Sequence, residues 1–293
     1  MTFLSYLISG ISLGSIYAII ALGYTMVYGI AKMLNFAHGD VIMVGAYVCF
    51  FAMTRFDLPA WIGVPLAMLV CTILGVVIER LAYKPLRQAS SLAVLITAIG
   101  VSYFLQNAAQ LLWSSGAKVF SPIIDNGSIK LFDGALQISY ITILTVACCI
   151  LIMIGLTLLV KKSKMGRAMR ACSEDKDAAR LMGINVDATI GFTFAIGSAL
   201  AAVAGVLLCS AYPALTPTTG SMPGIRAFTA AVFGGIGSIP GAFLGGILLG
   251  IIEIYAKAYI STELSDAVVF AVLIIVLLVK PTGLLGRRTH EKV

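Results

Sequence analysis

Residues 161–183 read KKSKMGRAMRACSEDKDAARLMG and form the one long, strongly charged segment of an otherwise apolar chain. The segment lies between the apolar runs 140–160 and 190–212, each long enough to cross a bilayer, for which about 20 residues are needed. The pattern therefore predicts a loop between membrane spans. We delimit it as residues 161–187 of a single transmembrane domain that covers residues 1–293.

The charged segment carries its own helix signals. Ser173 can cap a helix whose first turn holds Glu174 and Asp175 and whose last turn holds Arg180. Gly183 can end it, because glycine adopts the left-handed conformation that commonly follows a helix. We expect a short helix over residues 174–182.

An apolar stripe runs along this predicted helix. Ala178, Leu181 and Met182 fall at positions i, i+3 and i+4, framed by charges, and such a face suits a groove on another protein. The alternative is a solvated loop whose charges only set membrane topology.

Composition places the chain in a membrane. Hydrophobic residues make up 60% of it, charged residues 11%, and the mean hydropathy is +1.02. This is more apolar surface than a soluble core of 293 residues could hide, so we predict an all-α polytopic membrane protein. The net charge of +7 sits in short loops beside apolar runs, which argues for membrane topology and against nucleic acid. The six cysteines form no CxxC pair, and we predict no disulfide or metal site.

The apolar runs predict eight or nine membrane segments. They cover residues 4–30, 41–53, 61–78, 92–113, 140–160, 190–212, 227–236, 242–256 and 267–279. The runs 41–53, 227–236 and 267–279 are short and must borrow flanking residues, tilt, or enter the membrane only part-way.

Basic residues predict the orientation. They gather in residues 80–87, in residues 161–180 and after residue 279, which we therefore place in the cytoplasm together with the C-terminus. The connections 114–139 and 212–224 should face outward.

Two stretches interrupt the apolar pattern at membrane depth. One is NFAHGD, residues 35–40, and the other is FGGIGSIPGAFLGG, residues 233–246. Such sequence suits tight helix crossings or broken helices that line a cavity, and one interruption in each half favours an inverted repeat.

The first interruption offers candidate groups for a translocation pathway. Gly39 can release the helix, Asn35 and His38 offer hydrogen bonds to a polar solute, and Asp40 would be costly if it faced lipid. Capping of the following helix is the competing role for Asp40.

Other polar residues near the spans leave their roles open. Gln106 and Asn107 are candidates for the pathway and equally for hydrogen bonds between helices. Glu79 and Asp266 are expected at interfaces, whereas Glu253 is less easily assigned to one. The chain has no GxxxxGK[ST], HExxH or GxSxG motif, so we expect no catalysis by this chain alone.

Residues 177–183, DAARLMG, resemble the EAA-x-x-x-G loop by which bacterial ABC importer permeases dock on the ATP-hydrolysing subunit, with Asp in place of Glu. The hydrophobic-Pro continuation of that loop is missing. Three further stretches extend the resemblance over nearly the whole chain: SLGSIYAIIALGYTMVYGIAKMLNFAHGD (12–40), MGRAMRAC (165–172) and FTAAVFGGIGSIPGAFLGG (228–246). Together they resemble the LivH-type permeases of branched-chain amino acid importers.

The resemblance implies a permease subunit of the bacterial inner membrane that works with partners. These are a second, LivM-like permease, two ATP-binding subunits that use ATP and Mg, and an extracytoplasmic binding protein; this chain would bind no cofactor itself. The residues assigned to ATPase coupling are Gly166, Arg167, Arg170, Glu174, Asp177, Ala178, Ala179 and Gly183. The alternatives are a permease for urea or short-chain amides, and a self-sufficient ion-coupled carrier.

Overall fold

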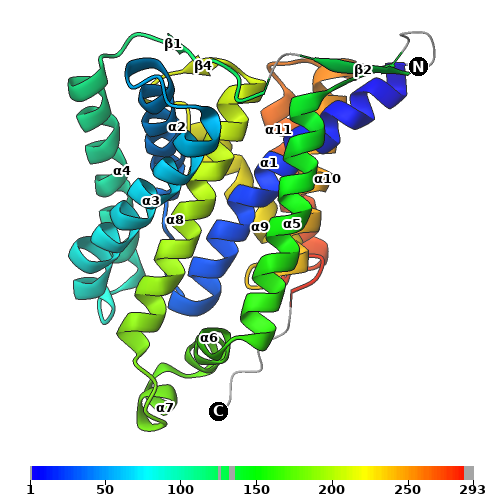
Figure 1. The fold of residues 1–293 in the computed structure, drawn as a ribbon. Helices are drawn as coiled ribbons and strands as arrows, with labels where there is room; N and C mark the ends of the chain where they lie inside the picture. Colours follow the sequence, from blue (N-terminus) through cyan, green and yellow to red (C-terminus); the bar gives the residue numbers. More distant parts are fainter. Residues whose placement is uncertain (1, 125–126, 132–135, 287–293) are drawn as a thin grey trace.

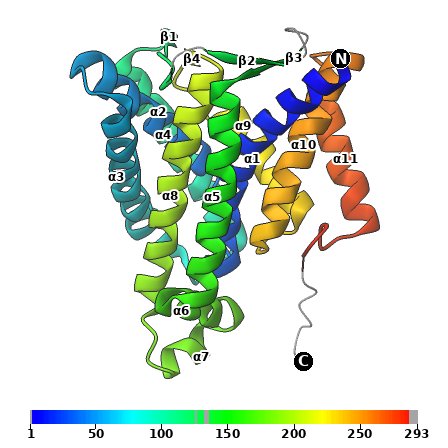
Figure 2. The same cartoon turned by 45° about the vertical axis from the view of Figure 1, so that its right-hand side comes forward.

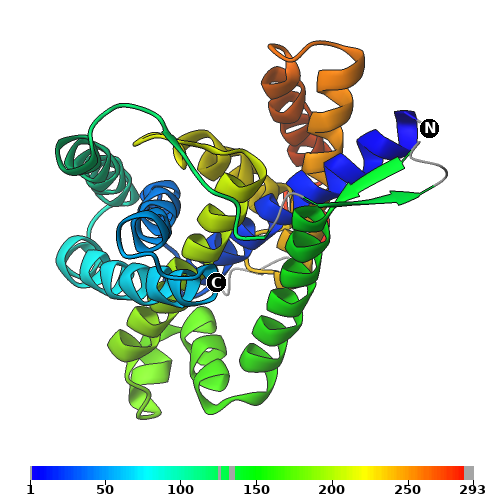
Figure 3. The ribbon, with the colours of Figure 1, turned by 45° about the horizontal axis from the view of Figure 1, so that its top comes forward.

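Helix α1 (Thr2–Ala31) lies at the centre of a bundle of helices in the computed structural model, which describes residues 2–124, 127–131 and 136–286 (Figure 1). Every residue from Leu13 to Val27 on this helix is buried. The helices that pack against it include α5 (Tyr140–Lys162), α8 (Val186–Ala211), α9 (Ser221–Gly234) and α10 (Ile239–Tyr259). Figure 3 shows the blue α1 crossing the bundle diagonally among them.

Small residues let α1 and α10 approach closely. Gly10, Gly14 and Ala18 follow one another at four-residue intervals on α1 and face Gly246 and Gly250 on α10. A Cβ atom at Gly250 would lie 2.8 Å from the carbonyl oxygen of Gly10, closer than a side-chain carbon can come. The small residues therefore fix this crossing, as they do between helices in membranes.

A second group of helices forms one flank of the bundle. It consists of α2 (His38–Arg55), α3 (Ala60–Ile78) with its continuation through the π-helical turn η1 (Glu79–Tyr83) and the 3₁₀ turn η2 (Lys84–Leu86), and α4 (Ser91–Trp113). Large apolar side chains stay exposed on α3, α4 and α5, among them Leu69, Leu111 and Leu151. These faces suit contact with lipid, whose chains are equally apolar.

In the part of the chain that the structure describes, six helices are long and apolar enough to cross a membrane: α1, α3 with its continuation to Leu86, α4, α5, α8 and α10. Among the shorter helices, α2 has 18 residues, α9 has 14 and α11 (Ser265–Val279) has 15. The all-α membrane fold is confirmed, but only six of the predicted eight or nine segments meet the length and composition of a full span. Helices α2 and α9 are covered by neighbouring helices, so their sequences need not be as apolar as lipid contact demands.

The strands and the charged segment mark opposite ends of the bundle (Figures 1 and 2). Two small antiparallel sheets pair β1 (Lys118–Val119) with β4 (Ala214–Leu215) and β2 (Ser128–Leu131) with β3 (Leu136–Ser139). The helices α6 (Lys164–Glu174) and α7 (Lys176–Leu181) lie at the other end. The two connections predicted to face outward therefore share one end, and the charged segment 161–183 lies opposite them.

The glycine-rich stretch 233–246 contains the turn between α9 and α10. Gly235 and Gly237 have φ angles of 105° and 91°, which favour glycine. The last carbonyls of α9 accept hydrogen bonds of 2.9 Å from the N–H groups of Leu284 and Leu285. The chain that follows α11 thus caps the end of α9, and no broken helix is needed here.

Candidate functional site

Helix α6 is amphipathic and is anchored to the end of α5. Ser163 caps it by accepting a hydrogen bond of 2.8 Å from the N–H of Gly166. A side chain at Gly166 would meet the carbonyl oxygens at the end of α5, so this glycine permits the sharp turn between the two helices. Met169 and Cys172 are buried on the same face. Burial in this apolar surrounding raises the pKa of the Cys172 thiol.

The opposite face of α6 carries the charged residues predicted for coupling. Arg167, Arg170 and Glu174 are all exposed. They are available to a partner, whereas the buried Gly166 contributes to the surface only through the backbone turn that it allows.

A second capped helix, α7, follows directly. Asp175 accepts hydrogen bonds of 2.8 and 3.0 Å from the N–H groups of Asp177 and Ala178. These amides favour the charged carboxylate and lower the pKa of Asp175, the Ala178 amide more than the Asp177 amide.

The predicted helix over residues 174–182 is therefore wrong at its start. Ser173 does not cap it, because its hydroxyl donates to the carbonyl of Arg170 within α6. The chain stays helical through Glu174, which allows Cys172 to be buried, and then takes the extended conformation at Asp175 that an N-cap requires. The predicted stop is confirmed: Gly183 has a φ of 78°, and Ile184 N–H donates to the carbonyl of Ala179 at 3.0 Å.

All three residues of the predicted apolar stripe are exposed, and the neighbouring Ala179 is buried. Leu181 and Met182 are 89% and 82% exposed, and Ala178 is exposed beside them. Ala179 is only 3% exposed, where α7 packs against α6 and α8. Two large apolar side chains at the tip of a membrane protein, away from the lipid-facing helices, form a surface that suits protein contact.

Ion pairs connect the base of α3 to the start of α8. The Arg87 guanidinium donates hydrogen bonds to the buried Glu79 and to Asp187. The Nζ atom of Lys84 lies 2.8 Å from Asp187 Oδ2. Glu79 was predicted at an interface. The structure gives it a partner eight residues away, which compensates the cost of burying its charge.

The break between α1 and α2 covers residues 32–37 and not the predicted 35–40, and the predicted pathway residues in it and in the first turn of α2 lie in the interior. Asn35, His38 and Asp40 are 4%, 1% and 2% exposed. The Tyr83 hydroxyl donates to Asn35 Oδ1 at 2.9 Å, and Gln106 Nε2 donates to Asp40 Oδ1 at the same distance.

Among the described residues, the Nε2 atom of His38 has no hydrogen-bond partner. The ring lies 4.6 Å, centroid to centroid, from that of Tyr24, and it faces the backbone of Gly23. This buried nitrogen therefore has hydrogen-bonding capacity that the described residues do not use.

Two predictions for the start of α2 are wrong. Asp40 does not cap the helix, which begins at His38 after Ala37, and lies instead in its first turn. Gly39 does not release the helix either. A Cβ atom there would lie 2.7 Å from the carbonyl oxygen of Gly220, so glycine allows α2 to touch the segment that leads into α9.

The two candidate amides on α4 lie apart. Gln106 is half-buried and reaches both Asp40 and Ser221, linking α4 to α2 and α9. Asn107 is exposed and donates to the carbonyl of Tyr103 on its own helix. Neighbouring residues on a helix point about 100° apart, and here that rotation separates the interior from the surface.

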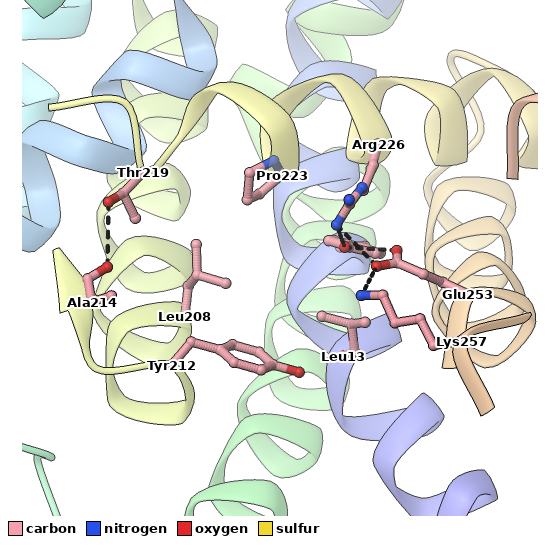
Figure 4. A pocket seen from close by; sticks show the side chains of 10 residues that line it. Leu13, Leu208, Tyr212, Ala214, Thr219, Pro223, Arg226, Glu253 and Lys257 are labelled. Atoms are coloured by element: carbon pink, nitrogen blue, oxygen red, sulfur yellow. Dashed lines mark hydrogen bonds and ion pairs between the residues drawn. The ribbon is translucent and has the colours of Figure 1, made fainter. Parts of the chain in front are cut away.

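Besides the ion pairs at Arg87 and the polar residues around Asp40, a further polar cluster surrounds Glu253 (Figure 4). The Glu253 side chain is 0% exposed. The cluster joins α10 to α1, α9 and α11 through Tyr17, Arg226, Lys257 and Asp266. Arg226 and Lys257 were not among the residues predicted to have a role. The spacing of Glu253 and Lys257, four residues apart on one helix, was the available indication.

Comparison with known proteins gives a consistent result. The model of a family described as the permease component of branched-chain amino acid transport systems matches residues 6–277. BraD of Pseudomonas aeruginosa and LivH of Escherichia coli K12, both permease proteins of high-affinity branched-chain amino acid transport systems, are each 48% identical over 99% of this chain and 98% of their own. In a solved structure of PsaBC from Streptococcus pneumoniae in complex with Fab, one chain matches with a TM-score of 0.50 over 96% of this chain and 93% of its own. Its identity of 14% shows a similar fold alone.

Proposed function

The chain belongs to the family of permease components of branched-chain amino acid transport systems, and from this premise we propose that it forms part of the membrane pathway for leucine, isoleucine and valine in an ATP-driven importer. It is a transport protein and not itself an ATPase. The observation that carries the proposal is similarity over nearly the full length to permeases named for this transport.

We assign the surface of α6 and α7 to the contact with the ATP-hydrolysing subunits. Leu181 and Met182 supply exposed apolar anchors, and Arg167 and Arg170 supply charge beside them. ATP and Mg belong to the partner in this proposal. The assembly is completed by two ATP-hydrolysing subunits, a second, LivM-like permease and a substrate-binding protein. The binding protein would dock at the end that carries the strands.

The same assembly places α6 and α7 in the cytoplasm of a bacterial cell, with the C-terminus on that side. The distribution of basic residues supports this orientation. Single cysteines at Ser128 and at Lys164, in a cysteine-free background, test it with a membrane-impermeant reagent on intact cells. We expect labelling at position 128 only, and the reverse pattern would invert the orientation.

We assign the polar interior of Asn35, His38, Asp40 and Gln106 to the border of the translocation route. Asn35 lies against η1 and His38 against α1, whereas Asp40 and the half-buried Gln106 lie between α2, α4 and the start of α9. Each carries hydrogen-bonding capacity that a moving polar solute can exchange for water. Asn35→Ala and His38→Ala should change the uptake rate while the complex still assembles. Normal uptake in both variants would remove this segment from the route.

Uptake by the reconstituted complex tests the cargo. We expect ATP-dependent uptake of leucine, isoleucine and valine with their binding protein, and none of urea or acetamide. Uptake of urea or amides alone would favour the related permease class. Uptake by this chain alone, driven by an ion gradient without ATP, would overturn the ATP-driven mechanism.

A further inference from the structure

A pocket of about 300 Å³ opens beside Glu253 at the end of the bundle that carries the strands. Its walls come from α1, α8, α9, α10 and the connection after α8 (Figure 4). Arg226, Glu253 and Lys257 form its charged side, whereas Leu13, Leu208 and Pro223 supply an apolar surface. The volume lies at the lower end of the range for small-molecule sites.

The carboxylate on the charged side accepts three hydrogen bonds from its neighbours. Glu253 Oε1 accepts hydrogen bonds from Arg226 at 2.9 Å and from Lys257 at 2.5 Å. Its Oε2 accepts one from the hydroxyl of Tyr17 at 2.8 Å. Arg226 is also paired with Asp266, whose Oδ1 lies 2.6 Å from Nη2 of the guanidinium. The two cations and two carboxylates of this cluster therefore balance, and Lys257 is the cation at the pocket that bonds to only one of the carboxylates.

Lys257 keeps donors in reserve. It has three N–H groups, its side chain is 31% exposed, and one of these groups bonds to Glu253. Nη1 and Nη2 of Arg226 bond to Glu253 and Asp266, and its Nε is buried out of reach of a molecule in the pocket. A carboxylate bound in the pocket would accept a hydrogen bond from Lys257.

We propose that this pocket is a binding site within the permease for an aliphatic α-amino acid. Its carboxylate lies against Lys257, and its branched side chain lies against Leu13 and Leu208. The assignment deepens the proposed function and rests on it. A purely structural ion pair explains Glu253 and Tyr17, but it leaves the spare donors and the adjoining apolar surface without a use.

The test uses the assembled importer in nanodiscs, without binding protein and without nucleotide, and measures retention of tritiated leucine by equilibrium dialysis. We expect saturable binding that Lys257→Met weakens about tenfold, the effect of one hydrogen bond between charged groups. Leu208→Trp, which fills the apolar side, should weaken it as well. Lys118→Met is the matched control, because Lys118 lies on β1 and does not line the pocket.

Competition experiments on the complex without substitutions test whether the pocket recognises the carboxylate of the ligand. They do not depend on any variant. We expect 4-methylpentanoate, which keeps the carboxylate, to displace leucine, and leucinol, which lacks it, to fail. Displacement by leucinol and not by 4-methylpentanoate would overturn the site, as would leucine binding that Lys257→Met leaves unchanged. If the complex with Lys257→Met does not assemble, the competition experiments and the Leu208→Trp variant decide whether leucine binds in this pocket.

The same preparation separates this inference from the proposed function. ATP-dependent uptake of leucine with binding protein present tests the function. If uptake proceeds but no saturable leucine binding occurs without the binding protein, the pocket assignment fails alone. If the complex takes up no branched-chain amino acid at all, the function fails first.

Discussion

The Nζ atom of Lys176 lies 2.7 Å from the backbone carbonyl oxygen of Ala31 and ties α7 to the C-terminal end of α1. The last carbonyls of a helix have no partner within it, and a cation is favoured at that end. Because α1 packs against α5, α8, α9 and α10, this bond gives a displacement of α7 a direct route to the interior.

Lys176→Met should uncouple transport from ATP hydrolysis. The substitution keeps much of the apolar stem but removes the donor to Ala31, while Leu181 and Met182 remain available for docking. We expect the ATPase to stay bound and uptake per ATP to fall about fivefold or more, the size of a modest coupling free energy. Lys164→Met on the exposed face of α6 is the control. Unchanged coupling in Lys176→Met would show that the bond only anchors the loop.

Leu181→Asp should weaken docking of the ATPase. A charge at an exposed apolar anchor loses the contact and adds the cost of burying the carboxylate, so affinity should fall about thirtyfold or more, the loss typical of a hot-spot residue. Co-purification and titration with the isolated ATPase measure it. Val119→Asp, at an equally exposed position on β1, should leave the affinity unchanged. Retained affinity in Leu181→Asp would move the contact elsewhere.

Tryptophan at Ala178 and at Ala179 should have different effects. Ala179 is buried, so Ala179→Trp overpacks the junction of α6, α7 and α8 and should cost about 1–3 kcal/mol of stability. Ala178 is exposed, so Ala178→Trp should leave thermal unfolding unchanged and obstruct docking instead. Thermal unfolding in detergent and ATPase titration report the two effects separately. Equal stability losses would contradict the burial that distinguishes the two positions.

The charged loop was predictable in kind but not in register. The charge and hydropathy patterns located the loop, and Gly183 correctly predicted the end of helix α7. Ser173 and Asp175 are both good capping residues, two positions apart, and propensity does not choose between them. The choice depends on burial of Cys172 against the neighbouring helices, as does the burial of Ala179. Both are tertiary contacts that the local sequence does not contain.

The buried polar residues were also predictable only in kind, because their partners lie far away in the sequence. The composition of residues 35–40 indicated buried polar groups, yet the partners of Asn35 and Asp40 lie 48 and 66 residues away. Pairings across such distances depend on how the helices cross, which one sequence does not specify. The crossing itself was partly visible, because glycines at regular intervals predicted close helix contacts.

Acidification should release the cap of α7. The Ala178 and Asp177 amides hold the pKa of Asp175 below its ordinary value, so the cap stabilises the helix above the unfolded pKa, about 3.9. That contribution is lost as the pH falls through the lower folded pKa. A carboxyl NMR titration of Asp175 in the detergent-solubilised chain should show the depressed pKa. Asp175→Ser keeps a cap that does not titrate and is the control. An ordinary pKa for Asp175 would mean that these hydrogen bonds are absent in solution.

Gln106→Leu and Asn107→Leu form a neighbouring pair that tests the bond from α4 to Asp40. Gln106→Leu removes the amide donor from a buried carboxylate and should cost about 1–3 kcal/mol, whereas Asn107→Leu on the exposed face should stay within about 0.5 kcal/mol. Removing both partners in Asp40→Leu/Gln106→Leu should recover most of the stability, because no buried group is then left without its partner. Thermal unfolding of the purified chain measures all three. If the double variant is no more stable than Gln106→Leu, or the two single variants behave alike, Asp40 and Gln106 do not form the energetic link that their 2.9 Å contact indicates.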